Sequence, residues 1–382
     1  MANQKRSQIK NKANTSLIPY GRQTIDADDI RVVVKVLKSN WLTQGPTVKK
    51  FEESLAKYCG AKFAVAVSNG TTALHLAYLA AEIGADDEVI TTPNTFVATT
   101  NMLIAVGAKP VFCDIRLDNY NIDETKIEAL ITPKTKAIVP VHFGGQPCEM
   151  NSILKLAKKY NLLVIEDACH ALGAAYRDKK IGSIGDMTVF SFHPVKSITT
   201  GEGGAILTNN KDYYEKLLHL RSHGIKKDRS GFNVMTALGY NYRITDIQAA
   251  LGLSQLKKLD GFVKKRNKIT ETYYKELLNL KDIVLPRITS NVLSASHILA
   301  ARVADNTKRL KLAEFLKKNG IGVNFHYPAV YSHPYYRQSG YGATKLTNEE
   351  IYHQSCITLP LYPTLGFKEI KYICNKIKEF YK

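Results

Sequence analysis

Residues 136–168, KAIVPVHFGGQPCEMNSILKLAKKYNLLVIEDA, contain a complete strand–helix–strand pattern. Residues 136–143 and 162–168 are apolar and rich in β-branched side chains, which predicts two strands, whereas residues 149–161 have helical spacing and end at an asparagine. Because both predicted strands are apolar almost throughout, they are typical of a parallel sheet that is covered on both faces. The stretch therefore predicts a crossover unit of an α/β domain.

The same alternation of strands and helices extends over residues 60–210. Further strands are predicted at residues 62–68, 87–93, 109–115 and 187–192, and further helices at residues 71–84, 95–107 and 124–132. Together these elements predict one large α/β domain with crossover helices between parallel strands.

After about residue 250 the pattern changes to long charged helices. They are predicted at residues 253–279 and 307–320, with short strands at 296–304 and 321–327 and helices at 348–359 and 368–381. This composition predicts a smaller α+β domain, with the domain boundary inside or at the end of a helix near residues 255–262. We expect a tail at residues 1–19, a large domain at residues 20–255 and a small domain at residues 256–382.

Composition excludes several classes of function. Apolar residues make up 45% and charged residues 23% of the 382 residues, as in soluble globular proteins. No apolar run approaches the roughly 20 residues that cross a bilayer, and the basic N-terminal segment lacks the apolar middle of a secretory signal. The net charge of +19 comes from dispersed lysines rather than a basic stripe, so we expect no nucleic-acid partner.

The six cysteines are widely spaced and include no C-x-x-C pair. The spacing indicates neither a disulfide framework nor a zinc ribbon, so reduced thiols in a cytoplasm are expected. His142, His170 and His193 would form a metal site only if the fold gathered them, and we predict no metal.

Ligands of open parallel α/β sheets bind beyond the carboxyl ends of the strands, and two polar motifs of the first half of the chain lie at such ends. In SNGTTAL, residues 68–74, a helix begins through Gly70, Thr71 and Thr72, whose N–H groups and hydroxyls suit a phosphate. In NTFVAT, residues 94–99, Phe96 suits stacking on an aromatic cofactor. Taken singly, an ordinary helix cap and a core phenylalanine are the competing interpretations.

Two more motifs carry charge at strand ends. In VIEDACHA, residues 164–171, Glu166 and Asp167 point to opposite faces of the sheet, so one of the two addresses the site. A buried carboxylate needs a cationic partner, and a protonated pyridine nitrogen would be one. In SFHPVKSITTGEGG, residues 191–204, Lys196 is a single amine among small residues, which partial burial would activate as a nucleophile.

Together the four motifs supply a phosphate anchor, a stacking ring, a carboxylate and an amine at one edge of a sheet. This set predicts a pyridoxal 5'-phosphate site, in which Lys196 binds the aldehyde and Asp167 keeps the ring nitrogen protonated. A nicotinamide enzyme is disfavoured, because SNGTTAL lacks the G-x-G-x-x-G of a dinucleotide-binding turn. A non-catalytic sensor that keeps the fold and binds cofactor or sugar is the other hypothesis.

The sequence resembles the DegT-type sugar-nucleotide aminotransferases, which are enzymes of the aspartate-aminotransferase-like fold type I. The resemblance covers nearly the whole chain and is carried by the motifs IPYGRQTID, SNWLTQGP, NGTTAL, TTPNTFVAT, EDACHALGA, SFHPVKSITTGEGG, GYNYRITDIQAALGLSQL and GVNFHYPAVY. It implies an α/β large domain with a mostly parallel seven-stranded sheet and a small C-terminal α+β domain. The family also contains dehydratases with histidine in place of the lysine, so the intact Lys196 favours transamination.

The resemblance also implies a role for individual residues. Lys196 would be the Schiff-base and proton-transfer lysine, Asp167 the partner of the pyridine nitrogen, Phe96 the stacking ring and His170 a neighbour of O3'. Phosphate contacts are implied for Gly70, Thr71, Ser191 and Asn241, of which Asn241 comes from the other subunit of a homodimer. Sugar-nucleotide contacts are implied for Tyr20, Asn40, Trp41, Leu42, Thr43, Asn241, Asn324, Phe325, His326 and Tyr327.

Among family members, the motifs SFHPVK, LTQGP and NFHY are most similar to enzymes that aminate C4 of a UDP-4-keto-6-deoxy-L-sugar in pseudaminic acid biosynthesis. This similarity implies a cytoplasmic homodimer that uses L-glutamate, releases 2-oxoglutarate and aminates the keto sugar. Amination of C4 in a D-configured sugar, as in bacillosamine pathways, or of C3 in another nucleotide sugar, is the alternative.

Overall fold

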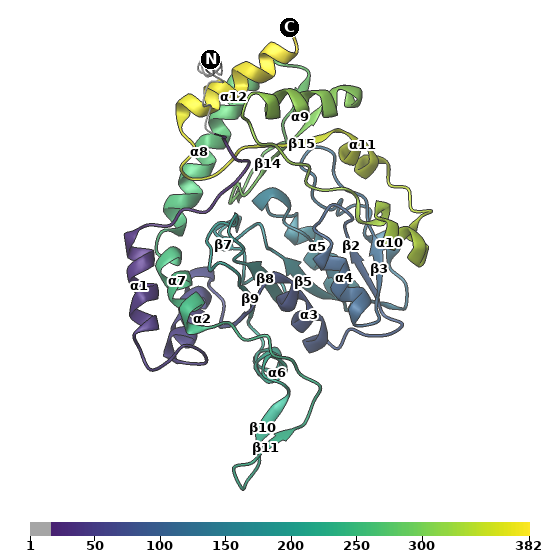
Figure 1. The fold of residues 1–382 in the computed structure, drawn as a ribbon. Coiled ribbons are helices and arrows are strands. Elements are labelled where there is room, and N and C mark those ends of the chain that lie inside the picture. The colour runs from purple at the N-terminus through teal and green to yellow at the C-terminus, as the bar shows by residue number, and fades with distance from the viewer. Residues whose placement is uncertain (1–16) are drawn as a thin grey trace, which may run out of the picture.

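The computed structural model describes residues 17–382, so the first 16 residues of the expected tail lie outside the described residues. A central sheet is flanked by helices, and a second layered unit containing the C-terminus packs above it in Figure 1. Ile18 is buried in this second unit, where its backbone pairs with Ile321. No helix of the described part of the chain is long and apolar enough to span a bilayer.

The central sheet has seven strands in the order β1-β9-β8-β5-β4-β2-β3. Their bounds are β1 Phe63–Val67, β2 Glu88–Thr91, β3 Lys109–Phe112, β4 Thr135–Val139, β5 Leu163–Asp167, β8 Met187–Ser191 and β9 Gly204–Thr208. Neighbouring strands from β8 to β3 are parallel, whereas β9 is antiparallel to both β1 and β8. The predicted seven-stranded, mostly parallel sheet is confirmed.

Helices cover both faces of this sheet. Successive side chains of a strand point to opposite faces, and in these strands both sets are apolar, so each face needs a covering layer. In β1, Ala64 and Ala66 belong to the core on one face and Val65 and Val67 to the core on the other. The helices of this part are α1 Ala27–Leu37, α2 Pro46–Cys59, α3 Gly70–Ala80, α4 Ala98–Ala105, α5 Met150–Tyr160, α6 Lys211–Arg221 and α7 Asp246–Leu256. Three short strands, β6 Ala175–Tyr176, β7 Lys179–Lys180 and β13 Val292–Leu293, form a separate small sheet.

The second unit has its own core around a three-stranded antiparallel sheet. Its elements are α8 Leu259–Leu277, β12 Ile283–Val284, β14 Leu299–Val303, α9 Arg309–Lys318, α10 Pro334–Tyr336, α11 Thr347–Ser355, β15 Cys356–Leu359 and α12 Phe367–Phe380. The helix predicted over residues 253–279 is two helices, α7 and α8, and the break between them falls at Lys257 and Lys258. This break lies beside the domain boundary that we expect after residue 255.

Three other predicted elements are wrong. Residues 124–132 form only the 3-10 turn Glu128–Leu130, because Pro133 disfavours continuation of a helix. Residues 356–359 of the helix predicted at 348–359 form β15, whose apolar residues are buried beside β14. Residues 321–327 form no strand and pair only through single bridges at Ile321 and Asn324.

A two-stranded hairpin projects from the large unit, at the bottom of Figure 1. It consists of β10 Ile225–Lys227 and β11 Asn233–Met235, and every residue of both strands is exposed. We call residues 225–238 the arm. Phe232, Met235 and Leu238 of the arm are 71%, 67% and 71% exposed, which is unusual for large apolar side chains of an isolated chain.

Candidate active site

The segments that follow β1, β2, β5 and β8 meet at one cavity of about 690 Å³. This position, beyond the carboxyl ends of parallel strands, is where α/β sheets bind ligands. The residues of our predicted site that line the cavity are Tyr20, Gly70, Thr71, Phe96, Asp167, His170, Ser191, Lys196, Asn324, Phe325, His326 and Tyr327.

The end of β1 turns into α3 at the cavity wall. Asn69 caps the helix by accepting a hydrogen bond from the Thr72 N–H at 2.9 Å, so the first turn begins at Gly70 with unpaired N–H groups. A Cβ on Gly70 would lie 2.9 Å from Cβ of Ser191, and one on Gly204 would lie 2.4 Å from the Asn69 carbonyl oxygen. Glycine at both positions lets β8 and β9 approach the turn, which makes a small cradle with the N–H groups suited to a phosphate.

Asp167 is the carboxylate that faces the cavity. It is the last residue of β5, and it accepts hydrogen bonds from the Thr99 hydroxyl at 2.7 Å and the Cys169 N–H at 3.1 Å. These two donors fix the orientation of the carboxylate without supplying a cation. The geometry therefore leaves Asp167 able to bind a cationic group inside the cavity.

Glu166 lies on the opposite face of the sheet and is fully buried. It accepts hydrogen bonds from the Gly185 N–H at 2.7 Å and the Thr188 hydroxyl at 2.8 Å, and its other oxygen is 2.8 Å from Nε2 of His142. His142 Nδ1 accepts a hydrogen bond from the Cys148 N–H. The ring proton is therefore on Nε2, which donates a hydrogen bond to Glu166. Of the two candidate carboxylates, only Asp167 lines the cavity.

No cluster of metal-ligating side chains occurs within residues 17–382. Among the three histidines considered from the sequence, His142 is bound to Glu166 beneath the sheet. His170 and His193 line the cavity. The fold therefore does not gather the three histidines.

Lys196 lines the cavity between Val195 and the glycine-rich segment. Its N–H donates to the His193 carbonyl oxygen at 2.9 Å, which closes a turn directly after β8. Burial lowers the pKa of the Lys196 amine, and the neighbouring Cys169 and Asp167 oppose this shift. A lowered pKa increases the fraction of neutral amine that is able to attack a carbonyl.

A group of aromatic side chains forms another part of the cavity wall. His170 Nδ1 accepts from the Gly144 N–H at 3.3 Å, so Nε2 donates to the Tyr327 hydroxyl, 3.1 Å away. The rings of His170 and His297 lie 4.5 Å apart between centroids. Burial lowers the pKa of both histidines well below its usual value, so both rings are neutral at neutral pH.

Phe96 and Tyr20 lie at the mouth of the cavity. Phe96 is 59% exposed, and its ring centroid is 6.1 Å from that of Tyr327. The Tyr20 ring lies 5.5 Å from the ring of His326, whose Nδ1 is hydrogen-bonded to the Thr358 hydroxyl at 2.9 Å. Phe96 is exposed and Tyr20 is half-buried, and both side chains line the cavity.

Five predicted contacts do not line this cavity. Four of them are exposed beside the N-terminus of α7, namely Asn40, Trp41, Leu42 and Thr43. The Leu42 carbonyl accepts a hydrogen bond from the Asp246 N–H of this helix at 3.0 Å. Asn241 is exposed at the base of the arm and its backbone pairs with Ser222. Within one chain these residues lie apart from the predicted site.

Sequence reasoning missed several residues of the cavity wall. Thr95 and Thr99 are four positions apart in a segment that leads into a helix, and this spacing would have predicted that both hydroxyls share a face. Asn69 could have been found as a helix cap. His297, which comes from the second unit, gave no local signal. The further wall residues that we missed include Cys169, Val195 and Glu202.

The fold and the cavity define a pyridoxal-phosphate-dependent transferase of fold type I. The glycine cradle, the cavity-facing Asp167 and the partly buried Lys196 fit the phosphate, the ring nitrogen and the aldehyde of that cofactor. The chain belongs to the DegT/DnrJ/EryC1/StrS aminotransferase family, whose sequence profile matches residues 23–378. The predicted family and fold are thereby confirmed, and pyridoxal 5'-phosphate is the cofactor of this family.

Individual relatives are similar over almost their full length. A UDP-4-amino-4,6-dideoxy-N-acetyl-β-L-altrosamine transaminase of Campylobacter jejuni is 42% identical over 94% of this chain and 96% of its own. The structure of Helicobacter pylori PseC, an aminotransferase of pseudaminic acid biosynthesis, matches with a TM-score of 0.92 and 35% identity, covering 96% of this chain and 99% of PseC. The pyridoxal-phosphate form of a putative sugar aminotransferase of Streptococcus pneumoniae matches with a TM-score of 0.90 and 31% identity, covering 95% and 98%.

Proposed function

We propose that this aminotransferase moves the amino group of L-glutamate to C4 of UDP-2-acetamido-2,6-dideoxy-β-L-arabino-hex-4-ulose. The product is a UDP-4-amino sugar for pseudaminic acid biosynthesis, and 2-oxoglutarate is released. The observation that carries the proposal is the cavity in which Lys196, Asp167 and the α3 cradle meet. The choice of sugar is supported by the similarity to the C. jejuni transaminase and to PseC.

The cofactor would be held at three points. Gly70 and Thr71 at the N-terminus of α3, together with Ser191, suit its phosphate. Asp167 suits the protonated ring nitrogen, because a carboxylate pairs with a buried cation. Phe96 would stack on the ring, and His170 would lie near its O3'. When bound, the cofactor carries the amino group between the two substrates and withdraws electrons from the reacting carbon.

Lys196 would perform the proton transfers. Its Nζ is the one side-chain amine that lines the cavity among the described residues. Since burial lowers its pKa, the neutral Nζ would accept a proton from the substrate carbon and, as an ammonium, would later donate that proton. The Asp167 carboxylate would be held in its orientation by the Thr99 hydroxyl and the Cys169 N–H.

The sugar nucleotide would extend from the reacting centre toward Tyr20 and residues 324–327, which line the cavity. Residues 40–43 and Asn241 lie outside the cavity of their own chain, so we infer that a second copy supplies them. The exposed apolar side chains of the arm, which ends close to Asn241, support a homodimer. A cytoplasmic location is part of the proposal and is supported by six free cysteines.

The test is to supply the purified protein with cofactor, L-glutamate and 4-keto UDP-sugars of the L-arabino and D-xylo configurations. We expect a visible absorbance band, its bleaching by glutamate, its recovery with the L-arabino sugar, and a 4-amino product identified by NMR. The Lys196→Ala variant should lack the band. Turnover of the D-xylo sugar alone would overturn the sugar assignment, and a band that glutamate leaves unchanged would favour the sensor hypothesis.

A further inference from the structure

Arg266 on α8 is a buried cation without an acidic partner. The residue is 1% exposed, and no carboxylate among residues 17–382 forms an ion pair with it. Burial lowers the pKa of its guanidinium to about 10. A buried charge is costly unless its donors are used, so the contacts of this side chain indicate what it does.

The guanidinium donates to three backbone carbonyl oxygens from separate segments. Nη1 lies 3.0 Å from the His297 oxygen and 3.2 Å from the Leu361 oxygen, and Nη2 lies 3.4 Å from the Val195 oxygen. Nε has no hydrogen-bond partner among the described residues. The planar fork of arginine thus joins three loops that approach α8 from both units.

Each of these carbonyls belongs to a residue that touches the active-site wall. Val195 immediately precedes Lys196, and both line the cavity. His297 packs against His170 with ring centroids 4.5 Å apart. The Leu361 N–H donates to the Tyr20 carbonyl oxygen at 3.0 Å. Through these carbonyls the Arg266 side chain connects the segments that carry Lys196, His297 and Tyr20.

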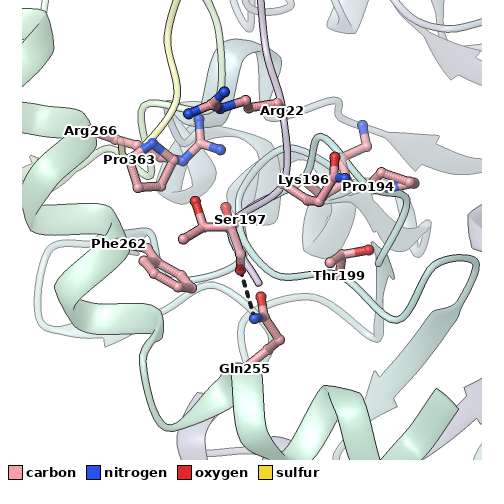
Figure 2. A pocket seen from close by; sticks show the side chains of 11 residues that line it. Arg22, Pro194, Lys196, Ser197, Thr199, Gln255, Phe262, Arg266 and Pro363 are labelled. Carbon is pink, nitrogen blue, oxygen red and sulfur yellow. Dashed lines mark hydrogen bonds between the residues drawn. The ribbon is translucent and has the colours of Figure 1, made fainter. Parts of the chain in front are cut away.

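An anion site is the competing interpretation, because Arg22 and Arg266 line a small second cavity together with Lys196. Figure 2 shows Arg266 beside Pro363, with Phe262 below them, on one side of this cavity and Lys196 beside Pro194 on the other. Its volume is about 10 Å³, which is roughly the space of a single water molecule. No substrate carboxylate or phosphate fits there, so the donors of Arg266 serve the protein backbone.

We propose that Arg266 is a positioning residue, which fixes the backbone of Lys196 and the His297–His170 wall relative to each other across the two units. The inference rests on the proposed function, since it assigns a role in placing the amine of that same site. Lysine cannot replace arginine here, because one ammonium group cannot reach three carbonyls in a fixed plane.

The experiment compares Arg266→Lys and Arg266→Met with the matched control Tyr273→Phe. Tyr273 is also buried on α8, and among the described residues its hydroxyl donates only to the Pro360 carbonyl, at 3.0 Å, and not to the carbonyls of Val195 or His297. Three quantities are measured for each protein: the urea midpoint, the kcat and KM, and the rate at which borohydride traps the cofactor on Lys196, followed by peptide mass spectrometry.

For Arg266→Lys we expect kcat to fall by about a hundredfold, which is the loss expected when a catalytic group is displaced by roughly 1 Å. We also expect borohydride to trap the cofactor on Lys196 more slowly than in the wild-type protein. Tyr273→Phe should lower the urea midpoint and keep kcat and the trapping rate. Wild-type kcat and trapping rate in a folded Arg266 variant would overturn the proposal. So would failure of both Arg266 variants to fold, because Arg266 would then act on stability alone. Absence of trapping in the wild-type protein would instead overturn the proposed function.

Discussion

At the scale of single residues, the adjacent carboxylates Glu166 and Asp167 have different surroundings. Asp167 lines the cavity and accepts two hydrogen bonds, whereas Glu166 is buried beneath the sheet with three donors around it. The difference arises from the alternation of side chains along β5. Substitution of each by its amide should therefore affect different properties of the protein.

We expect Asp167→Asn to lower kcat while the protein stays folded. Losing a hydrogen bond to a charged group costs about 1.5–3 kcal/mol, which is roughly a ten- to hundredfold decrease in rate. The measurement is the steady-state rate with glutamate and the keto sugar, together with the visible spectrum of the bound cofactor. An unchanged rate would contradict the assigned partner of the ring nitrogen.

Glu166→Gln is the matched control, because in either orientation the amide NH2 would face a donor, either the His142 Nε2–H or the Gly185 N–H and the Thr188 hydroxyl. We expect a loss of about 1–3 kcal/mol in the free energy of unfolding, the cost of an unsatisfied buried group, with kcat retained. Urea unfolding and initial rates measure the two effects. A variant with full stability and low kcat would show that Glu166 acts in catalysis.

At the scale of elements, the arm is held firmly at its base and makes few contacts beyond it. The Ser68 N–H donates to the Tyr242 carbonyl and the Tyr242 N–H to the Arg221 carbonyl, at 2.9 and 3.1 Å. These bonds fix the arm root beside the turn that leads into α3. Beyond the root, the arm presents Phe232, Met235 and Leu238 to solvent. An arm with this composition is typical of an oligomer contact.

Replacement of Phe232, Met235 and Leu238 by serine should convert the proposed homodimer to a monomer. Burial of each large apolar side chain contributes about 1.5–3 kcal/mol, so the dissociation constant should rise by several powers of ten. Sedimentation velocity over a concentration series measures the change. The control is Leu278→Ser, at an isolated exposed leucine after α8; a wild-type dimer in the triple variant would exclude the arm as the contact.

At the scale of the whole molecule, the cavity lies where the two units meet. Its wall combines strand ends of the large sheet with His297 and residues 324–327 of the second unit. His170, His297 and His326 are all buried there, and burial lowers their pKa values, that of His326 to about 4. Protonation of these buried rings is therefore unfavourable in the folded protein.

The free energy of unfolding should consequently fall as the pH drops from about 6.5, the histidine pKa of an unfolded chain, to about 4. A lowered folded-state pKa means that the unfolded chain binds more protons in this range, so acid favours unfolding. His326→Asn, which keeps a partner for the Thr358 hydroxyl, should reduce this slope in urea titrations between pH 7 and 5. An identical slope in the variant would contradict the prediction.

The sequence by itself determined the α/β class, the strand ends that carry the motifs, and the family, because strand periodicity and helix starts are local properties of the chain. Strand alternation and the family resemblance assigned Asp167 to the site, whereas only the tertiary structure decided that Glu166 is bound to His142 on the other face and that β9 runs antiparallel between β1 and β8. It also brought Arg266 and His297 close to the site. Both residues are far from Lys196 in the sequence, and only the packing of the two units places them near it, so no local pattern in the sequence could indicate their contacts.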